Sequence, residues 1–278
     1  MKFLGEILNL LNTQMTTPDP YGVFHLFFFV LSIIAGILLC KFKKDAEEHF
    51  VRKLLLVTSL TVILLEIYKQ INFSFTYENG QILFDYQWYA FPFQFCSTPM
   101  YIGFAAALVK NERIHHSLCA YLGTYALSAG LCVMFYPVSV FIGTVGINIQ
   151  TMICHGSMVT IGMYLLRTGY VKAEPATIRK ALPVFLTLLL MAASMNELAY
   201  QTGLLETETF NMFFISPYCA PELPVYSMAQ QALPFPLSLG VYVVAFTTAS
   251  ELILMFTRFA QKETRIAAHT LRRAYASC

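Results

Sequence analysis

The sequence predicts an all-α membrane protein, a seven-transmembrane helix bundle. Hydrophobic residues make up 57% of its 278 residues, charged residues make up 12%, and the mean hydropathy is positive. These values exclude an ordinary soluble globular domain. A hydrocarbon core about 30 Å thick needs roughly 20 apolar residues per helix. Charge-poor stretches of this length predict spans at residues 21–40, 54–73, 89–109, 117–136, 148–166, 181–200 and 234–256.

The two least obvious elements are the N-terminal segment and the turn between the fourth and fifth spans. We expect residues 1–20 to form an outer-surface segment rather than a secretory signal, because Glu6 interrupts their apolar stretch and no small-residue cleavage site follows. No charged residue lies between Arg113 and Arg167. The fourth and fifth spans therefore form a hairpin, which turns among the Pro and Gly residues of 137–146.

The positions of the basic residues predict the orientation. All of the 18 Lys and Arg residues except Lys2 and Lys69 fall on alternate connections or in the tail. Such connections are cytoplasmic in membrane proteins, so we expect the N-terminus outside and the C-terminus inside. The domains are then the outer segment, a transmembrane domain of residues 21–257 and a basic cytoplasmic tail of residues 258–278. The net charge of +2 reflects topology and does not indicate nucleic-acid binding.

The cysteines do not predict a disulfide framework. They occur at positions 40, 96, 119, 132, 154, 219 and 278, without a CxxC pair or the spacing of a zinc site. Cys132 and Cys219 lie near the expected outer face, where they could pair. The default interpretation of Cys132 and Cys154 is a small apolar filler between helices.

Polar side chains at a common depth predict a functional site. They are His25, Glu66, Gln94, Cys96, His155 and Asn196. At 1.5 Å per residue, most of them lie roughly 6 to 10 Å from the outer ends of their spans. Ionisable residues inside a membrane span are costly and usually face the bundle interior, so each of them is a candidate.

Cys96 and His155 are the expected catalytic pair. A proline on either side of Cys96 frees backbone groups at membrane depth, which predicts a cavity beside the thiol. A thiol becomes a useful nucleophile when a neighbouring base favours the thiolate, and a carboxylate or amide can orient that base. His155 would be the base, and Glu66 or Asn196 would orient it.

Simpler interpretations of these residues stay open. His155 could be a core histidine hydrogen-bonded between helices. Glu66 and Lys69 stand three residues apart and could neutralise each other. In the long outer loop, the apolar residues 210–217 are expected to fold back onto the bundle as a lid or re-entrant segment, or to anchor the loop in the membrane interface. Either arrangement places Asn211 near the site.

Four segments of the chain resemble the YwaF-type integral membrane proteins. They are Phe-Pro-Phe-Gln-Phe-Cys-Ser at residues 91–97, His155-Gly156, Asn196, and Asn-Met-Phe-Phe-Ile-Ser-Pro at residues 211–217. The resemblance extends roughly from the second span through the seventh. Its signature is Pro-x-Gln/His-x-Cys-Ser, and this chain has Gln94 where many relatives have His.

The resemblance implies an activity and a location. The YwaF-type members are bacterial, which implies a multi-pass protein of a bacterial cell membrane. Their suspected distant kin include a mammalian cysteine-dependent phospholipid acyltransferase. What the resemblance implies is acyl chemistry on lipids through Cys96 with His155.

The leading hypothesis is therefore a membrane-embedded lipid acyltransferase or acyl hydrolase with its site in the outer-leaflet half of the bundle. Cys96 would attack an acyl ester and His155 would accept and return the proton. The oxyanion would be stabilised by Gln94, Ser97 or Asn211. Membrane phospholipids would be the acyl donor and acceptor, and no cofactor is needed.

Two hypotheses from other classes remain open. In the first, the protein is a non-catalytic transporter or lipid-binding protein whose polar layer holds a head group. In the second, it is an intramembrane zinc hydrolase that uses His25, His155 and Glu66, because a catalytic zinc site takes three protein ligands and an open position.

Overall fold

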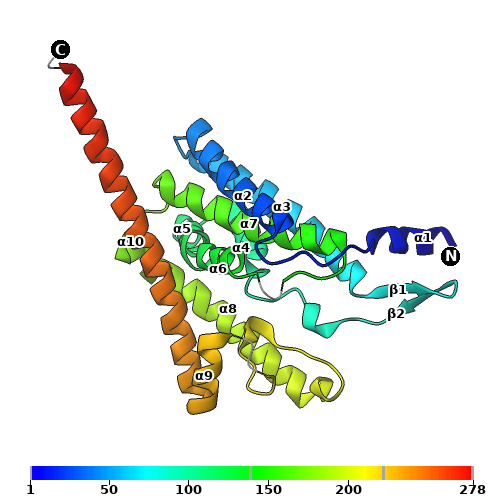
Figure 1. Cartoon of the computed structure of the whole chain (residues 1–278). Coiled ribbons are helices and arrows are strands. Elements are labelled where there is room, and N and C mark those ends of the chain that lie inside the picture. The colour runs from blue at the N-terminus through cyan, green and yellow to red at the C-terminus, as the bar shows by residue number, and fades with distance from the viewer. Residues whose placement is uncertain (1, 138–139, 221–222, 277–278) are drawn as a thin grey trace.

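The computed structural model describes residues 2–137, 140–220 and 223–276, and of residues 224, 225 and 264–276 it describes the backbone only. The protein is mainly helical (Figure 1). Its helices are α1 (Lys2–Leu11), α2 (Val23–Phe42), α3 (Glu48–Asn72), α4 (Thr98–Leu108), α5 (Glu112–Tyr121), α6 (Leu127–Phe135), α7 (Val145–Arg167), α8 (Pro175–Gln201), α9 (Pro224–Ala232) and α10 (Phe235–Ala276). Helix α7 contacts α2, α3 and α6 and so occupies the middle of the bundle.

Among the described residues, five helical stretches are long and apolar enough to cross a membrane. They are Val23–Phe42, Glu112–Phe135, Val145–Arg167, Pro175–Gln201 and Phe235–Glu263. The second of these joins α5 to α6 through a π-helical segment, Leu122–Ala126. An all-α membrane protein is therefore confirmed. The other two expected spans fall on α3, which is 25 residues long and contains several charged side chains, and on the 11-residue α4.

The expected third span, residues 89–109, is not one continuous helix. A 3₁₀ turn at Trp88–Ala90 is followed by a non-helical stretch, and α-helix begins only at Thr98. Pro92 has no N–H and disfavours helical backbone at the preceding residue. Pro99 lies in the first turn of α4, where a missing N–H costs nothing. The two prolines thus turn the expected span into a half-length helix with Cys96 just before it.

A β-hairpin precedes this break and was not expected from the sequence. Strands β1 (Phe75–Glu78) and β2 (Gln81–Phe84) are antiparallel. Asn79 and Gly80 connect them with φ angles of 51° and 79°, and this pair of positive angles is typical of a type I′ turn. Helix α1 contacts β1, and Figure 1 shows α1 and the hairpin at the end of the molecule opposite the C-terminal part of α10.

Small residues bring the helices of the bundle close together. Gly103 of α4 faces the hydroxyl of Ser59 on α3, and Gly156 of α7 faces that of Ser32 on α2, in both cases with no room for a Cβ atom. Close crossings at small residues are a common way for membrane helices to associate. Helix α10 continues unbroken past Phe256, so the boundary of the expected basic tail is one of composition rather than structure.

Arg52 closes the C-terminal end of α4. Its Nη1 donates to the carbonyl oxygens of Ala106, Ala107 and Val109 at 3.1, 3.3 and 2.7 Å. Its Nε donates to Glu48 at 2.7 Å, and this hydrogen bond lowers the pKa of the Glu48 carboxyl. The last carbonyl groups of a helix have no partner within the helix, so one guanidinium satisfies this end of α4.

We expect Arg52→Met to lower the free energy of unfolding by about 2 kcal/mol, because the methionine keeps an apolar stem but leaves these carbonyls without charge-assisted donors. Denaturant titration in detergent micelles would measure the change. Lys53→Met, an exposed site on the same helix, is the matched control. An equal loss in both variants would contradict the capping role.

Candidate functional site

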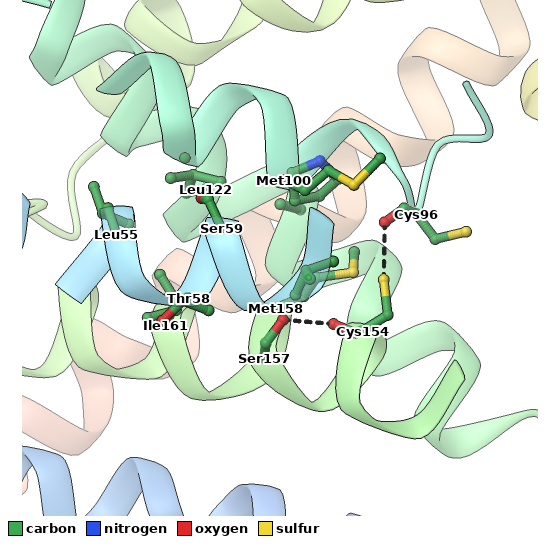
Figure 2. A pocket seen from close by; sticks show the side chains of 14 residues that line it. Leu55, Thr58, Ser59, Cys96, Met100, Leu122, Cys154, Ser157, Met158 and Ile161 are labelled. Atoms are coloured by element: carbon green, nitrogen blue, oxygen red, sulfur yellow. Dashed lines mark hydrogen bonds between the residues drawn. The ribbon is translucent and has the colours of Figure 1, made fainter. Parts of the chain in front are cut away.

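Cys96 lies at the N-terminal end of α4. Its side chain is half-buried, and it is followed by Ser97, the N-cap residue, and Thr98, the first residue of the helix. The Cys96 carbonyl oxygen accepts a hydrogen bond from the Cys154 thiol at 3.5 Å, whereas the Cys96 sulfur does not point toward Cys154 (Figure 2). The positive end of a helix dipole favours an anion, so this position is suited to a thiolate.

His155 presents a free acceptor nitrogen in the interior. Its Nδ1 lies 2.8 Å from the carbonyl oxygen of Thr151. Because a carbonyl only accepts hydrogen bonds, the proton of the neutral ring is on Nδ1 and Nε2 carries a lone pair. The residue is 5% exposed, and Nε2 has no hydrogen-bond partner among the described residues. An unpaired buried nitrogen is uncommon in folded proteins and calls for an explanation.

The expected pairing of Cys96 with His155 stays a prediction. No hydrogen bond joins their side chains in the described parts of the chain. The α7 residue that contacts the backbone of Cys96 is Cys154. Neighbouring residues on a helix point about 100° apart, so Cys154 and His155 face different sides of α7.

Glu66 is the centre of a buried polar network. Lys69 Nζ lies 2.8 Å from its Oε1, which also accepts a hydrogen bond from Gln70 at 2.8 Å, and Oε2 accepts one from Gln150 of α7 at 3.2 Å. The ion pair with Lys69 is the neutralising arrangement that the sequence left open. Tyr86 extends the network by donating to Gln70 at 2.7 Å, and burial, reinforced by the Glu66 charge, raises the pKa of the Tyr86 phenol. Both carboxylate oxygens of Glu66 therefore have partners other than His155.

Two side-chain amides hold the apolar segment 210–217 against the bundle. Gln94 donates to the carbonyl of Asn211 at 3.0 Å and accepts from the Phe213 N–H at 3.1 Å. Asn196 of α8 donates to the carbonyl of Met212 at 3.0 Å and accepts from its N–H at 2.7 Å. The segment is thus folded back onto the helices, which is one of the two arrangements that the sequence left open.

The same segment is strained and deeply packed. Phe213 and Phe214 have φ angles of 59° and 57°, which for residues other than glycine costs on the order of 1–3 kcal/mol each. The ring of Phe213 stacks on Phe95 at 5.1 Å, and Tyr242 of α10 donates to its carbonyl at 3.2 Å. Asn211 stabilises the turn by accepting from the N–H of Ser216 at 2.9 Å. Burial and hydrogen bonding offset the strain.

His25 has a structural role. Its Nδ1 accepts a hydrogen bond from the N–H of Tyr21 at 3.2 Å, so Nε2 carries the proton and donates to the carbonyl of Met134 on α6 at 3.0 Å. Within the described residues, no group of three His, Cys, Asp or Glu side chains could hold a metal ion. The zinc hypothesis, which required His25, His155 and Glu66 to meet, therefore has no ligand set there.

A contact between a cysteine and a histidine lies on α5, away from Cys96 and His155, and it was not predicted from the sequence. His115 and Cys119 stand four residues apart on α5, a spacing that could have revealed it. The thiol of Cys119 lies 3.6 Å from His115 Nε2, which also lies 2.6 Å from the Tyr170 hydroxyl, and Nδ1 lies 2.8 Å from the Ala106 carbonyl. Both nitrogens are occupied and Cys119 is fully buried. We interpret this cluster as a tie between helices.

The outer cysteines do not form a bridge. Cys132 and Cys219 are both free thiols. The Cys219 sulfur donates to the carbonyl of Phe210 at 3.4 Å and so contributes to the fold of the outer loop.

The fold and this polar layer define a multi-span helical membrane protein with ionisable and amide side chains buried among its helices. A sequence model of the TMEM164 family, a family of membrane proteins, matches residues 20–260. This stretch is most of the chain, so the chain belongs to the TMEM164 family. None of the curated proteins and none of the solved structures matches it.

We expect Asn196→Leu to lower the free energy of unfolding by roughly 2 to 4 kcal/mol, because it leaves the buried N–H and carbonyl of Met212 without partners. Denaturant titration and limited proteolysis of the outer loop would measure the change. Ser194→Ala, at an exposed position on the same helix, is the control. A protease-resistant loop in Asn196→Leu would contradict the clamping role.

Proposed function

We propose that the protein is a membrane-embedded lipid acyltransferase or acyl hydrolase, with Cys96 as nucleophile and His155 as general base. The observation that supports this most strongly is the buried Nε2 of His155, which is deprotonated and has no partner among the described residues. The position of Cys96 before α4 is the second support, because the helix dipole stabilises a thiolate. Catalytic hydrogen bonds often form only with substrate bound, so the proposal does not require a contact between the two at rest.

The proposed reaction has two halves. The Cys96 sulfur attacks the carbonyl carbon of a lipid ester, and its proton moves to His155 Nε2. As the ester C–O bond breaks, His155 returns the proton to the leaving alcohol and a thioester remains on Cys96. Water or a second lipid alcohol then attacks the thioester carbonyl carbon and loses its proton to His155. As the C–S bond breaks, His155 gives this proton to the Cys96 sulfur, and the acyl group leaves as a fatty acid or as a new ester.

In this proposal, Ser97 is the hydrogen-bond donor that stabilises the oxyanion. Gln94 and Asn211 were the other expected donors. The Nε2 of Gln94 already donates to the Asn211 carbonyl, and Asn211 uses its Oδ1 to hold the turn of the segment 210–217. Ser97 is buried directly after Cys96. Its hydroxyl would donate to the oxygen that becomes negative as the tetrahedral intermediate forms.

The resemblance to YwaF-type proteins supports the same function and adds its setting. It suggests kinship with a cysteine-dependent phospholipid acyltransferase and a location in a bacterial cell membrane. Phospholipids of that membrane would be both acyl donor and acceptor, and the chemistry needs no cofactor.

Purified protein incubated with phosphatidylethanolamine and phosphatidylcholine vesicles, then quenched in acid, should carry an acyl mass on Cys96 in intact and peptide mass spectrometry. Cys96→Ser should abolish this adduct. His155→Ala should slow its formation by at least about tenfold, because general-base catalysis contributes that much or more. The exposed Cys132 offers the matched control, and Cys132→Ser should acylate normally. Acylation that persists in Cys96→Ser, or a folded wild-type protein that never acylates, would overturn the proposal.

We also propose the full seven-span topology, with the N-terminus outside and the C-terminus in the cytoplasm. The distribution of Lys and Arg supports it. Exposed apolar side chains on α3, including Val57, Leu60 and Leu64, support counting this helix among the spans despite its charges. In this arrangement α4 would form the inner part of a span begun by the non-helical stretch.

A reporter enzyme that is active only in the cytoplasm should be active when fused after Cys278 and inactive when fused before Met1. This result is expected because the connections rich in Lys and Arg are retained on the cytoplasmic side. The reverse pattern, or reporter activity at both ends, would contradict the seven-span topology.

A second candidate function is a transporter or lipid-binding protein in which nothing reacts. The observation that favours it is the mutual satisfaction of the polar layer, because Glu66, Gln94 and Asn196 each bond to other parts of the chain. Lipid transfer between vesicles that is unchanged in Cys96→Ser would favour this second function over the first.

A further inference from the structure

We call the non-helical stretch between Ala90 and Thr98 the helix break. A cleft of about 340 Å³ lies between α3 and the chain on either side of this break. Its walls are mainly apolar and include Ile63, Ile67, Ile71, Pro92, Met100 and Tyr101. This volume equals roughly eleven times the 30 Å³ that one water molecule occupies in the liquid. The cleft is therefore large enough for a substantial length of hydrocarbon chain.

The cleft lies between α3 and α4 and opens at the surface of the bundle. Ile67 is 52% exposed, Leu64 beside it is 67% exposed, and Tyr101 across the cleft is 39% exposed. In a protein of this class, exposed apolar side chains along a helix at this depth face lipid rather than water. The surrounding medium that can fill the cleft is therefore the acyl chains of the bilayer.

The polar groups of the cleft do not need water. Tyr101 donates to the carbonyl of Pro92 at 2.8 Å, and Ser74 donates to the carbonyl of Gln70 at 2.6 Å. The carboxylate of Glu66 is bonded on both oxygens. A hydrocarbon chain can occupy the cleft without leaving any of these groups unsatisfied.

Met100 separates this cleft from the interior beside Cys96. Its buried side chain lines the cleft, and it also lines an inner cavity of about 30 Å³ whose walls include Cys96, Cys154 and Met158 (Figure 2). The inner cavity holds about one water molecule and is too small for an acyl chain. Methionine is unbranched and has three rotatable bonds, so it can move aside more readily than a branched residue.

We propose that the cleft between α3 and the helix break binds an acyl chain of a membrane phospholipid, which approaches sideways from the bilayer, and that Met100 is the gate between this chain and Cys96. The binding site stands on the cleft itself. The gating role deepens the proposed function and rests on it.

The binding site is tested with a phosphatidylcholine that carries a diazirine in one acyl chain, mixed into phosphatidylcholine vesicles with the full-length protein. After irradiation, cross-linked peptides should come from residues 63–75 and 92–101. Cross-links confined to other helices would overturn the proposal, and this outcome is decided on the wild-type protein alone.

Two variants sharpen the test. Ile67→Trp should lower cross-linking in the cleft by at least about fivefold, because a bulky ring fills the space that the chain would occupy. Leu64→Trp, exposed on the same helix but outside the cleft, should leave it within about twofold of wild type. Equal cross-linking in Ile67→Trp and Leu64→Trp would contradict chain binding in the cleft.

The gate is tested at Met100. Met100→Leu conserves volume but is branched, so it should keep cross-linking in the cleft and lower acylation of Cys96 by at least about fivefold. Wild-type acylation in Met100→Leu would contradict the gating role. Cross-linking in the cleft should persist in Cys96→Ser, so a cleft that binds lipid without any acylation would refute the proposed function and leave the binding site in place.

Discussion

The fold of the segment 210–217 depends on two side-chain amides that replace the backbone partners a neighbouring strand would supply. Gln94 and Asn196 approach the segment 211–213 from different parts of the bundle and bond to its N–H and carbonyl groups. Unpaired backbone groups are costly at membrane depth, so an irregular segment can be buried there only with such partners. The clamp also holds in place the strained backbone at Phe213.

The same constraint distinguishes buried polar groups whose hydrogen bonds are complete from those that keep an unpaired atom. A buried polar group whose hydrogen bonds are all made is stable and has nothing left to offer a substrate. Glu66 and His25 are of this kind, and His115, with both ring nitrogens engaged beside Cys119, is another. His155 differs from the buried histidines His25 and His115 because one of its nitrogens has no partner among the described residues. The difference lies in bonding rather than in depth.

The sequence could predict how deep each polar side chain lies along its helix, but not the direction in which the side chain points. Composition and charge spacing were enough to place five of the seven expected spans on long apolar helices of the described residues, and the ion pair of Glu66 with Lys69 follows from their spacing of three. Depth along a helix comes from counting residues, whereas the direction of a side chain depends on how each helix is rotated and packed. The sequence could not reveal that Cys154, and not His155, faces the backbone of Cys96. The β-hairpin was predictable, since Asn79-Gly80 is a strong turn signal.

The length of α10 has a mechanical consequence. Its 42 residues extend about 63 Å at 1.5 Å per residue, whereas a bilayer with its head groups is about 40 to 45 Å thick. In the proposed orientation, about 20 Å of unbroken helix must project into the cytoplasm. A rigid rod of that length would carry the end of the helix backbone away from the membrane surface, as a stalk does.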